Sequence, residues 1–498
     1  MKLVLINPNL TRPVGDLLGS GVPYMPVVLA YVAGNLKKEG VEFELIDAFG
    51  EAPEKIRKEG DFWVHGLKEK EIVEKLKTEK FDIIVIFGQS IMSFDTLCKI
   101  IKTIKHDIPD IPIIVIENTQ AVTAFSLKAA AKELFDAGAT FLLAGETDRT
   151  LIKFSQYYKK GKIDNSIPGL IVKKGKKILA NDIDFIQDLD NLPYPAWELF
   201  PIENYWKLGY AHGPMSAKYL TILTSRGCPY NCAFCVVPAT NYRRWRFRSA
   251  KNVVDELEFL QKKFNVSEFH LEDLNSGMNK YRMREIAKEI VARNLKLTWK
   301  IVAGTKIEHL ADKETLLWMN RAGCKYISIS PESGSKKVLK LMNKPFDHKF
   351  AIEMIGYMNE LNIFSQACFV LGFPGEKKED LTLTRNYIIE LTKKGIDEIA
   401  LFIMTPIPGS GTFGKIKGYK TYSELTFSPS WREDYSPLAS LRLRYYLIFF
   451  ICKLFFHPQK VMRQLFNIIK KRFETKMEMV FYRTLKNLWM QQKSLFYQ

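Results

Sequence analysis

Cysteine is scarce in this sequence, with seven residues in a chain of 498. So few cysteines exclude a framework of disulfide bonds. Long apolar runs are missing too: the run over 445–452 ends at Lys453, whereas a membrane-spanning helix needs about 20 apolar residues. The first residues, MKLVLINPN, lack the basic-then-apolar pattern of a signal peptide. We therefore expect a protein of the reducing cytoplasm, long enough for two or three domains.

Acidic residues are outnumbered, 55 against 73 Lys and Arg, which gives a net charge of +18. Much of the excess lies in residues 438–498, which hold twelve Lys or Arg and two Glu. Basic, aromatic-rich helices can lie in an anionic membrane surface, so one expectation is peripheral association with the inner face of the membrane. The alternative is a helical cap that packs its apolar face on the rest of the protein. Nucleic acid binding is not expected, because no recognisable binding module accompanies the charge.

A fourth cysteine is missing from the one tight cysteine cluster. Cys228, Cys232 and Cys235 have the spacing C-x3-C-x2-C, and no other cysteine lies within 85 residues. Thiolates bind iron–sulfur clusters or zinc, and closed sites normally have four protein ligands. Three thiolates can hold three irons of a cubane cluster and leave the fourth iron open to a substrate or cofactor. The alternatives are a zinc site completed by a distant His, or three structural cysteines.

Short apolar strands alternate with helical patterns over residues 1–160. The strands are expected at 3–7, 42–46, 82–87, 113–116 and 140–143, and the helices at 26–38, 71–79, 94–106, 127–136 and 150–159. This alternation predicts a doubly wound parallel sheet covered on both faces. Ligands of such a sheet bind at the carboxyl ends of its strands, so the loops 7–24, 88–93, 117–123 and 145–150 are the candidates for a binding site.

Residues 161–215 read as a connector, with a hairpin turning at 174–177 and an extended stretch interrupted by Pro193, Pro195 and Pro201. The alternation of strands and helices then returns. Strands are expected at 219–224, 268–272, 298–302, 326–330, 366–371 and 398–404. Residues 416–498 fall outside this pattern and are expected to form the basic, aromatic-rich helical extension.

The cysteine loop resembles the signature of the radical S-adenosylmethionine (SAM) superfamily, in which the residue before the last Cys is usually aromatic, as Phe234 is here. The resemblance implies a [4Fe–4S] cluster held by the three Cys, with SAM on the fourth iron. It implies that one electron, from a flavodoxin- or ferredoxin-type donor, cleaves SAM to a 5′-deoxyadenosyl radical. It also implies that residues 216–415 form a partial (β/α)6 barrel.

The same resemblance implies SAM contacts at the carboxyl ends of the barrel strands. The acidic pair after the second strand would lie near the SAM ammonium group, the run PESGS near the ribose and carboxylate, and the run GFPGE near adenine, where glycines allow close approach of the backbone. The residues concerned are Phe234, Glu272, Asp273, Glu332, Ser333, Gly372, Gly375 and Glu376. Loop capping and tight turns are the alternatives for these groups, and no residue is assigned a catalytic role.

The first 160 residues resemble the cobalamin-binding domain that precedes the barrel in one subfamily. The resemblance rests on NPN near the start, PVVLAYVAGNLKKEG followed by VEFELIDAF, and AGETDRTL. Two features depart from it: the motif D-x-H-x-x-G is absent, and Glu117-Asn-Thr-Gln120 stands where Gly-Gly is usual. The alternative is a domain that keeps this fold and has lost its cofactor.

Four arginines, Arg243, Arg244, Arg246 and Arg248, are interleaved with two aromatic residues. They could bind phosphate or nucleic acid. We expect a solvated loop for most of them, followed by a helix over 252–263 with Ser249 as its N-cap.

Taken together, the resemblances imply a cobalamin-dependent radical SAM methyltransferase. One SAM would methylate cobalamin, a second would be cleaved at the cluster, and an unactivated carbon of a small-molecule or lipid-like substrate would receive the methyl group. The runner-up is a radical SAM cyclase, oxidase or C–C coupling enzyme whose first domain donates no methyl group. A non-enzymatic metal-bearing protein that binds RNA or a membrane is the remote alternative.

Overall fold

The computed structural model describes residues 1–16, 21–163 and 166–496. The N-terminal sheet has seven strands in the order β10-β9-β8-β7-β6-β1-β3. Its parallel strands are β1 (Lys2–Asn7), β3 (Glu42–Asp47), β6 (Ile83–Gly88), β7 (Ile113–Glu117) and β8 (Phe141–Leu143). Helices α1 (Val27–Lys38), α2 (Glu69–Leu76), α3 (Phe94–Asp107), α4 (Ala131–Ala137) and α5 (Thr147–Lys159) cover it. The doubly wound parallel sheet is therefore confirmed.

The strands of this sheet are buried on both faces. Leu3 and Leu5 of β1 pack in one core with helix α1, whereas Val4 and Ile6 pack in a second core with helix α3. Since successive side chains of a strand point to opposite faces, an all-apolar strand requires a helical layer on each side.

Two additions to this domain were not expected. The predicted hairpin consists of β9 (Leu170–Lys174) and β10 (Lys177–Ala180), and β9 pairs antiparallel with β8, so the hairpin extends the first sheet. A separate antiparallel sheet joins β2 (Leu10–Pro13), β5 (Phe62–His65) and β4 (Ile56–Glu59). Part of the predicted loop 7–24 is thus a strand. The rest of the connector holds helix α6 (Ile202–Leu208).

The second half contains six parallel strands in chain order. They are β11 (Tyr219–Ile222), β14 (Glu268–Leu271), β15 (Thr298–Thr305), β16 (Cys324–Glu332), β17 (Phe364–Leu371) and β18 (Glu398–Ile403). The helices between them are α8 (Ala250–Phe264), α9 (Lys280–Ala292), α10 (Ile307–Leu310), α11 (Lys313–Arg321), α12 (Lys336–Leu341), α13 (His348–Glu360) and α14 (Lys378–Lys393). The predicted partial barrel is confirmed, and Ser249 caps α8 as expected.

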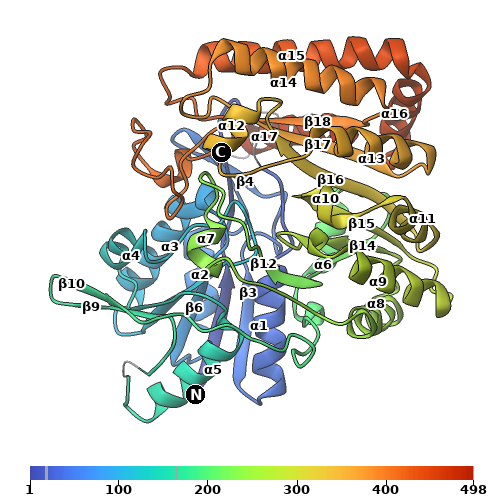
Figure 1. Ribbon diagram of the computed structural model, residues 1–498. Coiled ribbons are helices and arrows are strands. Elements are labelled where there is room, and N and C mark those ends of the chain that lie inside the picture. Colours follow the sequence, from blue (N-terminus) through green and yellow to red (C-terminus); the bar gives the residue numbers. More distant parts are fainter. Residues whose placement is uncertain (17–20, 164–165, 497–498) are drawn as a thin grey trace.

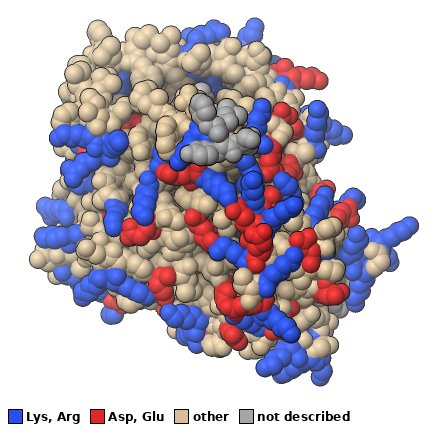
Figure 2. All heavy atoms as spheres, turned by 180° about the vertical axis from the view of Figure 1, so that it is seen from behind, with Lys and Arg blue, Asp and Glu red and all other residues tan. Residues whose placement is uncertain are grey.

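The C-terminal extension forms α15 (Tyr435–Phe456), α16 (Pro458–Lys470) and α17 (Lys476–Phe496). Helix α15 packs on α14 and β18 at one end of the molecule, at the top in Figure 1. Seen from behind, uncharged side chains cover much of that end and some Lys and Arg side chains lie along its rim, whereas both signs are interspersed over the middle (Figure 2). Among the described residues, no helix is both long and apolar enough to cross a membrane.

Helix α17 takes a different course from α15 and reaches back into the molecule. Its Met490 packs with Ile56 and Trp63 of the small N-terminal sheet. Just before the helix, the Phe473 amide donates a hydrogen bond of 3.1 Å to the Met215 carbonyl, which precedes β11. The extension therefore contacts both the N-terminal domain and the barrel.

Candidate functional site

The three cysteines lie in the loop between β12 (Ser225–Gly227) and α7 (Val237–Asn241). Each is a free thiol. The Asn275 side-chain amide lies 4.0 Å from Cys228 Sγ, and the Val237 amide donates to Cys235 Sγ over 3.5 Å. Such N–H···S contacts are among the features that tune an iron–sulfur cluster. Two of the three thiols, Cys228 and Cys235, therefore have an N–H donor of the protein beside the sulfur.

Burial raises the pKa of all three thiols, that of Cys232 to about 11. These groups therefore keep their protons at neutral pH until a metal replaces them. Among the described residues, no three His, Cys, Asp or Glu side chains converge on a single metal ion. Three ligands of a cubane cluster bind three different irons, so they do not have to converge on one point.

Two lysines that the sequence analysis missed lie beside the cysteine loop. Lys344 Nζ donates to Ser330 Oγ over 2.9 Å and lies 5.9 Å from the centre of the Phe234 ring. Lys306 Nζ lies 4.7 Å from the centre of the Tyr230 ring. Burial raises the pKa of Cys228 and Cys232, and the charges of the two lysines make that rise smaller. The cysteine loop therefore has two lysines beside it, each accompanied by a carboxylate: Glu332 for Lys344 and Glu308 for Lys306.

Glu332 ends strand β16 beside these lysines. Its backbone is in the left-handed region, with φ of 62°, and its side chain is buried in an ion pair with Lys344. Burial raises the pKa of Glu332, and Lys344 opposes that shift. The next residue, Ser333, turns instead toward α14, where its hydroxyl lies 3.2 Å from Thr384 Oγ1. Of the two residues predicted to contact SAM here, Glu332 is therefore linked to the cysteine loop through Lys344, whereas Ser333 contacts α14.

The two acidic residues after β14 have different partners. Asp273 accepts hydrogen bonds from the Thr224 amide and hydroxyl and, at 2.6 Å, from the Ser225 hydroxyl, so it ties the end of β11 to β14. Glu272 lies 2.8 Å from His212 Nδ1. Burial favours a raised pKa for Glu272, but the charge and hydrogen bond of His212 outweigh it and the pKa is lowered. SAM binding by either residue stays a prediction.

The GFPGE turn follows β17 and meets the C-terminal extension. Gly372 has φ of 74°, and a Cβ there would lie 2.5 Å from Leu438 Cδ1. Arg432 donates to the Gly372 carbonyl over 3.1 Å, and the Gly372 amide donates to Glu376 over 2.7 Å. Burial raises the pKa of Glu376 to about 7. The close approach that Gly372 allows is thus made by the extension, whereas the neighbour of Gly375 is Leu341 of α12. Contact of either glycine with adenine stays a prediction.

The expected solvated arginine loop is wrong for two of its four members. Arg246 pairs with Glu146 of the N-terminal domain at 2.6 Å, and Arg248 is buried against Glu256 at 2.6 Å. Arg243 and Arg244 are exposed, as expected. The partners of the buried arginines lie 100 residues upstream or one helix downstream, and no local pattern marked them.

Further contacts hold the cysteine loop against the carboxyl edge of the first sheet. Arg226, in β12, makes two hydrogen bonds of 2.6 and 2.9 Å with Asp148 of α5. The Gly227 amide donates to Gln120 over 3.2 Å, and the Asn241 side chain donates to the Thr119 carbonyl over 2.8 Å. The segment that replaces Gly-Gly therefore contacts the barrel.

Glu117 begins that segment and is fully enclosed. Its carboxylate accepts hydrogen bonds of 2.8 Å from the Leu127 amide and of 2.8 Å from the Gly145 amide. Burial raises its pKa to about 7. Close by, the buried Thr147 hydroxyl has no hydrogen-bond partner among the described residues. The edge of the first sheet thus combines a closed loop after β7 with an unsatisfied donor at the start of α5.

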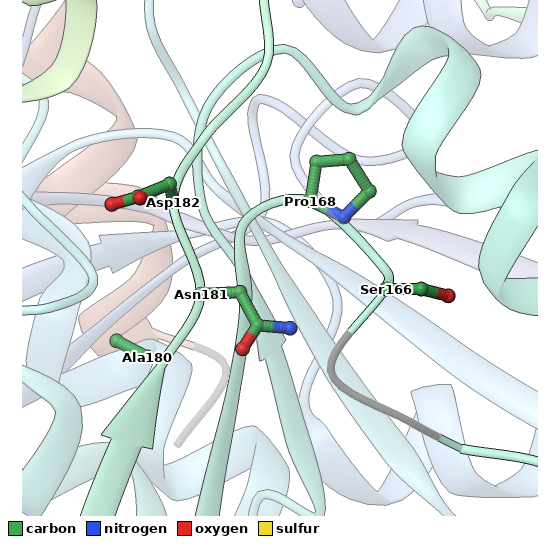
Figure 3. Close-up of a pocket in the computed structure, with 5 residues that line it drawn as sticks. All are labelled: Ser166, Pro168, Ala180, Asn181 and Asp182. Carbon is green, nitrogen blue, oxygen red and sulfur yellow. The ribbon is translucent and has the colours of Figure 1, made fainter.

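An open cavity of about 410 Å³ lies elsewhere, at the far edge of the N-terminal sheet. Ser166, Pro168, Ala180, Asn181 and Asp182 line it (Figure 3). None of the residues predicted to bind the cluster or SAM is among these five.

Known proteins resemble this chain in sequence and fold. Residues 222–388 match the Radical SAM superfamily. An uncharacterized methyltransferase of Pyrococcus horikoshii is 25% identical over 87% of this chain and 86% of that protein. The anaerobic magnesium-protoporphyrin IX monomethyl ester cyclase of Cereibacter sphaeroides is 27% identical over 77% of this chain and 59% of that protein.

A solved structure shows the same fold. The radical S-adenosylmethionine methyltransferase TsrM from Kitasatospora setae, with cobalamin and a [4Fe–4S] cluster bound, has a TM-score of 0.62 at 16% identity. The similarity covers 83% of this chain and 74% of TsrM. It therefore includes both the N-terminal sheet and the barrel.

Proposed function

The chain belongs to the radical SAM superfamily, and we propose that it cleaves SAM at a [4Fe–4S] cluster and methylates an unactivated carbon with the help of cobalamin. The observation that carries the proposal is the position of Cys228, Cys232 and Cys235, after the first strand of a six-stranded parallel barrel and against the carboxyl edge of the first sheet. When bound, the cluster supplies the electron for SAM cleavage and cobalamin supplies the methyl group.

The residues around the loop have separate tasks in this proposal. The three cysteines hold the cluster. Lys306 and Lys344 favour the thiolate form of Cys232, and Lys344 also fixes Glu332 at the end of β16. Glu272, paired with His212, and Glu376 are the carboxylates proposed to lie around SAM. Asp273 positions the strand ends that carry the cysteine loop, through its contacts with Thr224 and Ser225.

Cobalamin fits the first domain on two grounds. The carboxyl ends of β1, β6, β7 and β8 lie along one edge of the sheet, which is where ligands of this fold bind. The unsatisfied, buried Thr147 hydroxyl at the start of α5 provides a hydrogen-bonding group at that edge.

The test is anaerobic purification with cobalamin supplied, followed by assays for iron, sulfide and cobalamin and for deoxyadenosine formed with SAM and dithionite. We expect a cluster, about one cobalamin per chain and deoxyadenosine. Cys228→Ala should abolish the cluster and deoxyadenosine, whereas Cys98→Ala, on α3, should change neither. Cleavage that persists in Cys228→Ala would refute the proposed cluster site.

A second function is favoured by the Glu117 loop and by the similarity to the cyclase. In it, the first domain binds no cobalamin and the radical completes a cyclisation, oxidation or C–C coupling. Deoxyadenosine without bound cobalamin and without a methylated product would support this second function. Methylated product formed in step with deoxyadenosine would exclude it.

A further inference from the structure

Helices α15 and α16 expose an apolar surface that the rest of the described structure leaves uncovered. We call it the outer face, and its side chains are between 42% and 78% exposed. Its members are Leu443, Leu447, Phe450, Ile451, Leu454, Phe455, Met462, Leu465, Phe466 and Ile469. Isolated exposed apolar residues are common, but a gathering of this kind marks an interaction site.

Helix α15 is apolar on opposite sides. Leu438, Tyr445 and Phe449 are between 0% and 8% exposed and lie within the core of the protein. Leu447 and Ile451, with their neighbours, form a stripe at helical spacing on the outer face. A helix that is apolar all round is normally covered on every side. Here the barrel covers one side, and the opposite side is left for another apolar partner.

Helix α16 continues the surface. Met462, Leu465, Phe466 and Ile469 follow the spacing i, i+3, i+4, i+7 and are between 52% and 78% exposed. The same helix is held to the barrel through Lys460, whose Nζ pairs with Asp397 at 2.8 Å. Helices α15 and α16 contact each other, so their exposed stripes are adjacent.

Cations predominate around this face. Residues 435–473 contain eight Lys or Arg and no Asp or Glu, but Lys453 is buried and Arg463 pairs at 2.5 Å with Glu474, just beyond this segment. The exposed cations include Arg444, Arg463 and the run Lys470 to Arg472. Lys470 Nζ lies 4.2 Å from the centre of the Phe466 ring, so cation and aromatic surface are adjacent. A second copy of the chain would bring two such positive surfaces together, which disfavours a dimer through this face.

We propose that α15 and α16 dock the protein on an anionic phospholipid membrane, with both helices in the plane of the surface. Protruding apolar side chains flanked by cations are the pattern of an interfacial helix. The apolar side chains would enter the boundary between headgroups and acyl chains, and the cations would meet lipid phosphates. Docking of this kind would bring the enzyme next to lipid-like molecules.

The full-length protein is sedimented with vesicles of phosphatidylcholine alone and of equimolar phosphatidylcholine and phosphatidylglycerol. We expect binding to the anionic vesicles and weakening at high salt, because the cations act through a screened field. The double variant Phe455→Ser/Ile469→Ser should bind at least about tenfold less, since it removes two apolar side chains from the membrane. The matched control Tyr281→Ser/Leu317→Ser, exposed on α9 and α11, should bind like the wild type.

The contribution of the charge is tested separately with the double variant Lys470→Gln/Lys471→Gln. Its affinity for the anionic vesicles should fall about fivefold per cation removed. Lys296→Gln/Lys349→Gln is the control for it. Circular dichroism confirms that each variant is folded. Failure of the wild type to bind anionic vesicles would overturn the proposal. So would a wild-type dimer in sedimentation equilibrium that Phe455→Ser/Ile469→Ser dissociates, because a second copy would then cover the face.

Discussion

Arg226 and Asp148 form a buried ion pair between the cysteine loop and the first domain, and its removal should be among the most damaging single changes. Two parallel hydrogen bonds of 2.6 and 2.9 Å join the side chains, which are only 3% and 1% exposed. The charge of Asp148 raises the pKa of Arg226 despite burial. Asp148→Asn keeps the shape of the side chain and removes its charge.

The expected loss follows from the burial of both partners. A buried charge left without its partner costs about 3–5 kcal/mol. The double variant Arg226→Met/Asp148→Asn removes both charges, so it should lose less than the sum of the single variants Arg226→Met and Asp148→Asn. The exposed pair of Lys218 and Glu203, with side chains 57% and 58% exposed, is the control. Glu203→Gln should cost less than about 1 kcal/mol.

The assay is equilibrium unfolding in urea, with the free energy of unfolding compared across the four members of the cycle. Iron content is the second measurement, because Arg226 lies two residues before Cys228. We expect Asp148→Asn to lower both, and Glu203→Gln to leave both unchanged. A loss below about 1 kcal/mol for Asp148→Asn, or losses that add in the double variant, would refute the reasoning.

Three further changes test other contacts. Burial raises the pKa of Glu117 to about 7, so the folded protein holds a proton that the unfolded chain has released. Stability should therefore fall as pH rises from about 4.5 to 7, by at most about 1.4 kcal/mol per unit, and Glu117→Gln should flatten the melting temperature over that range; an unchanged slope would contradict this. Gly372→Ala should cost about 1–3 kcal/mol, and adding Leu438→Ala should recover the part of that loss that comes from the clash with Leu438, as melting temperatures will show. Lys344→Met should cost about 3–5 kcal/mol, because it leaves a buried carboxylate unpaired, whereas exposed Lys340→Met should be silent in the same unfolding assay.

The sequence predicted those helices and strands whose burial is evident from a short stretch of neighbouring residues. Strand 3–7 was expected and Lys2–Asn7 was found, because a short run of apolar residues that ends at turn-forming residues favours a covered strand. All six barrel strands were located on the same grounds. Their ends differ from the prediction by up to three residues, as at β15, where Thr305 rather than Val302 is the last residue.

The features that the sequence did not reveal depend on distant partners. The strand Ile56–Glu59 has the sequence IRKE and shows no apolar alternation, so only its pairing with β5 identifies it. Lys344 is one lysine among many until the fold brings Glu332 to it. Arg246 looked like a solvated side chain because its partner, Glu146, lies 100 residues away. Local sequence patterns indicate which residues are buried, but they do not indicate which distant residues these side chains contact.

The C-terminal extension shows why its inner and outer sides must be judged separately. On the inner side, Leu438 packs on Gly372, and Lys476 Nζ donates to the Val302 carbonyl of β15 over 2.7 Å and lies 3.5 Å from His212 Nε2. Deleting the extension would therefore disturb the barrel and His212, the partner of Glu272, whether or not the protein binds a membrane. The outer side chains, such as Phe455 and Ile469, make none of these contacts and are each 78% exposed. Substitutions there separate docking from chemistry, because they change the surface that meets the lipid while the contacts to the barrel remain.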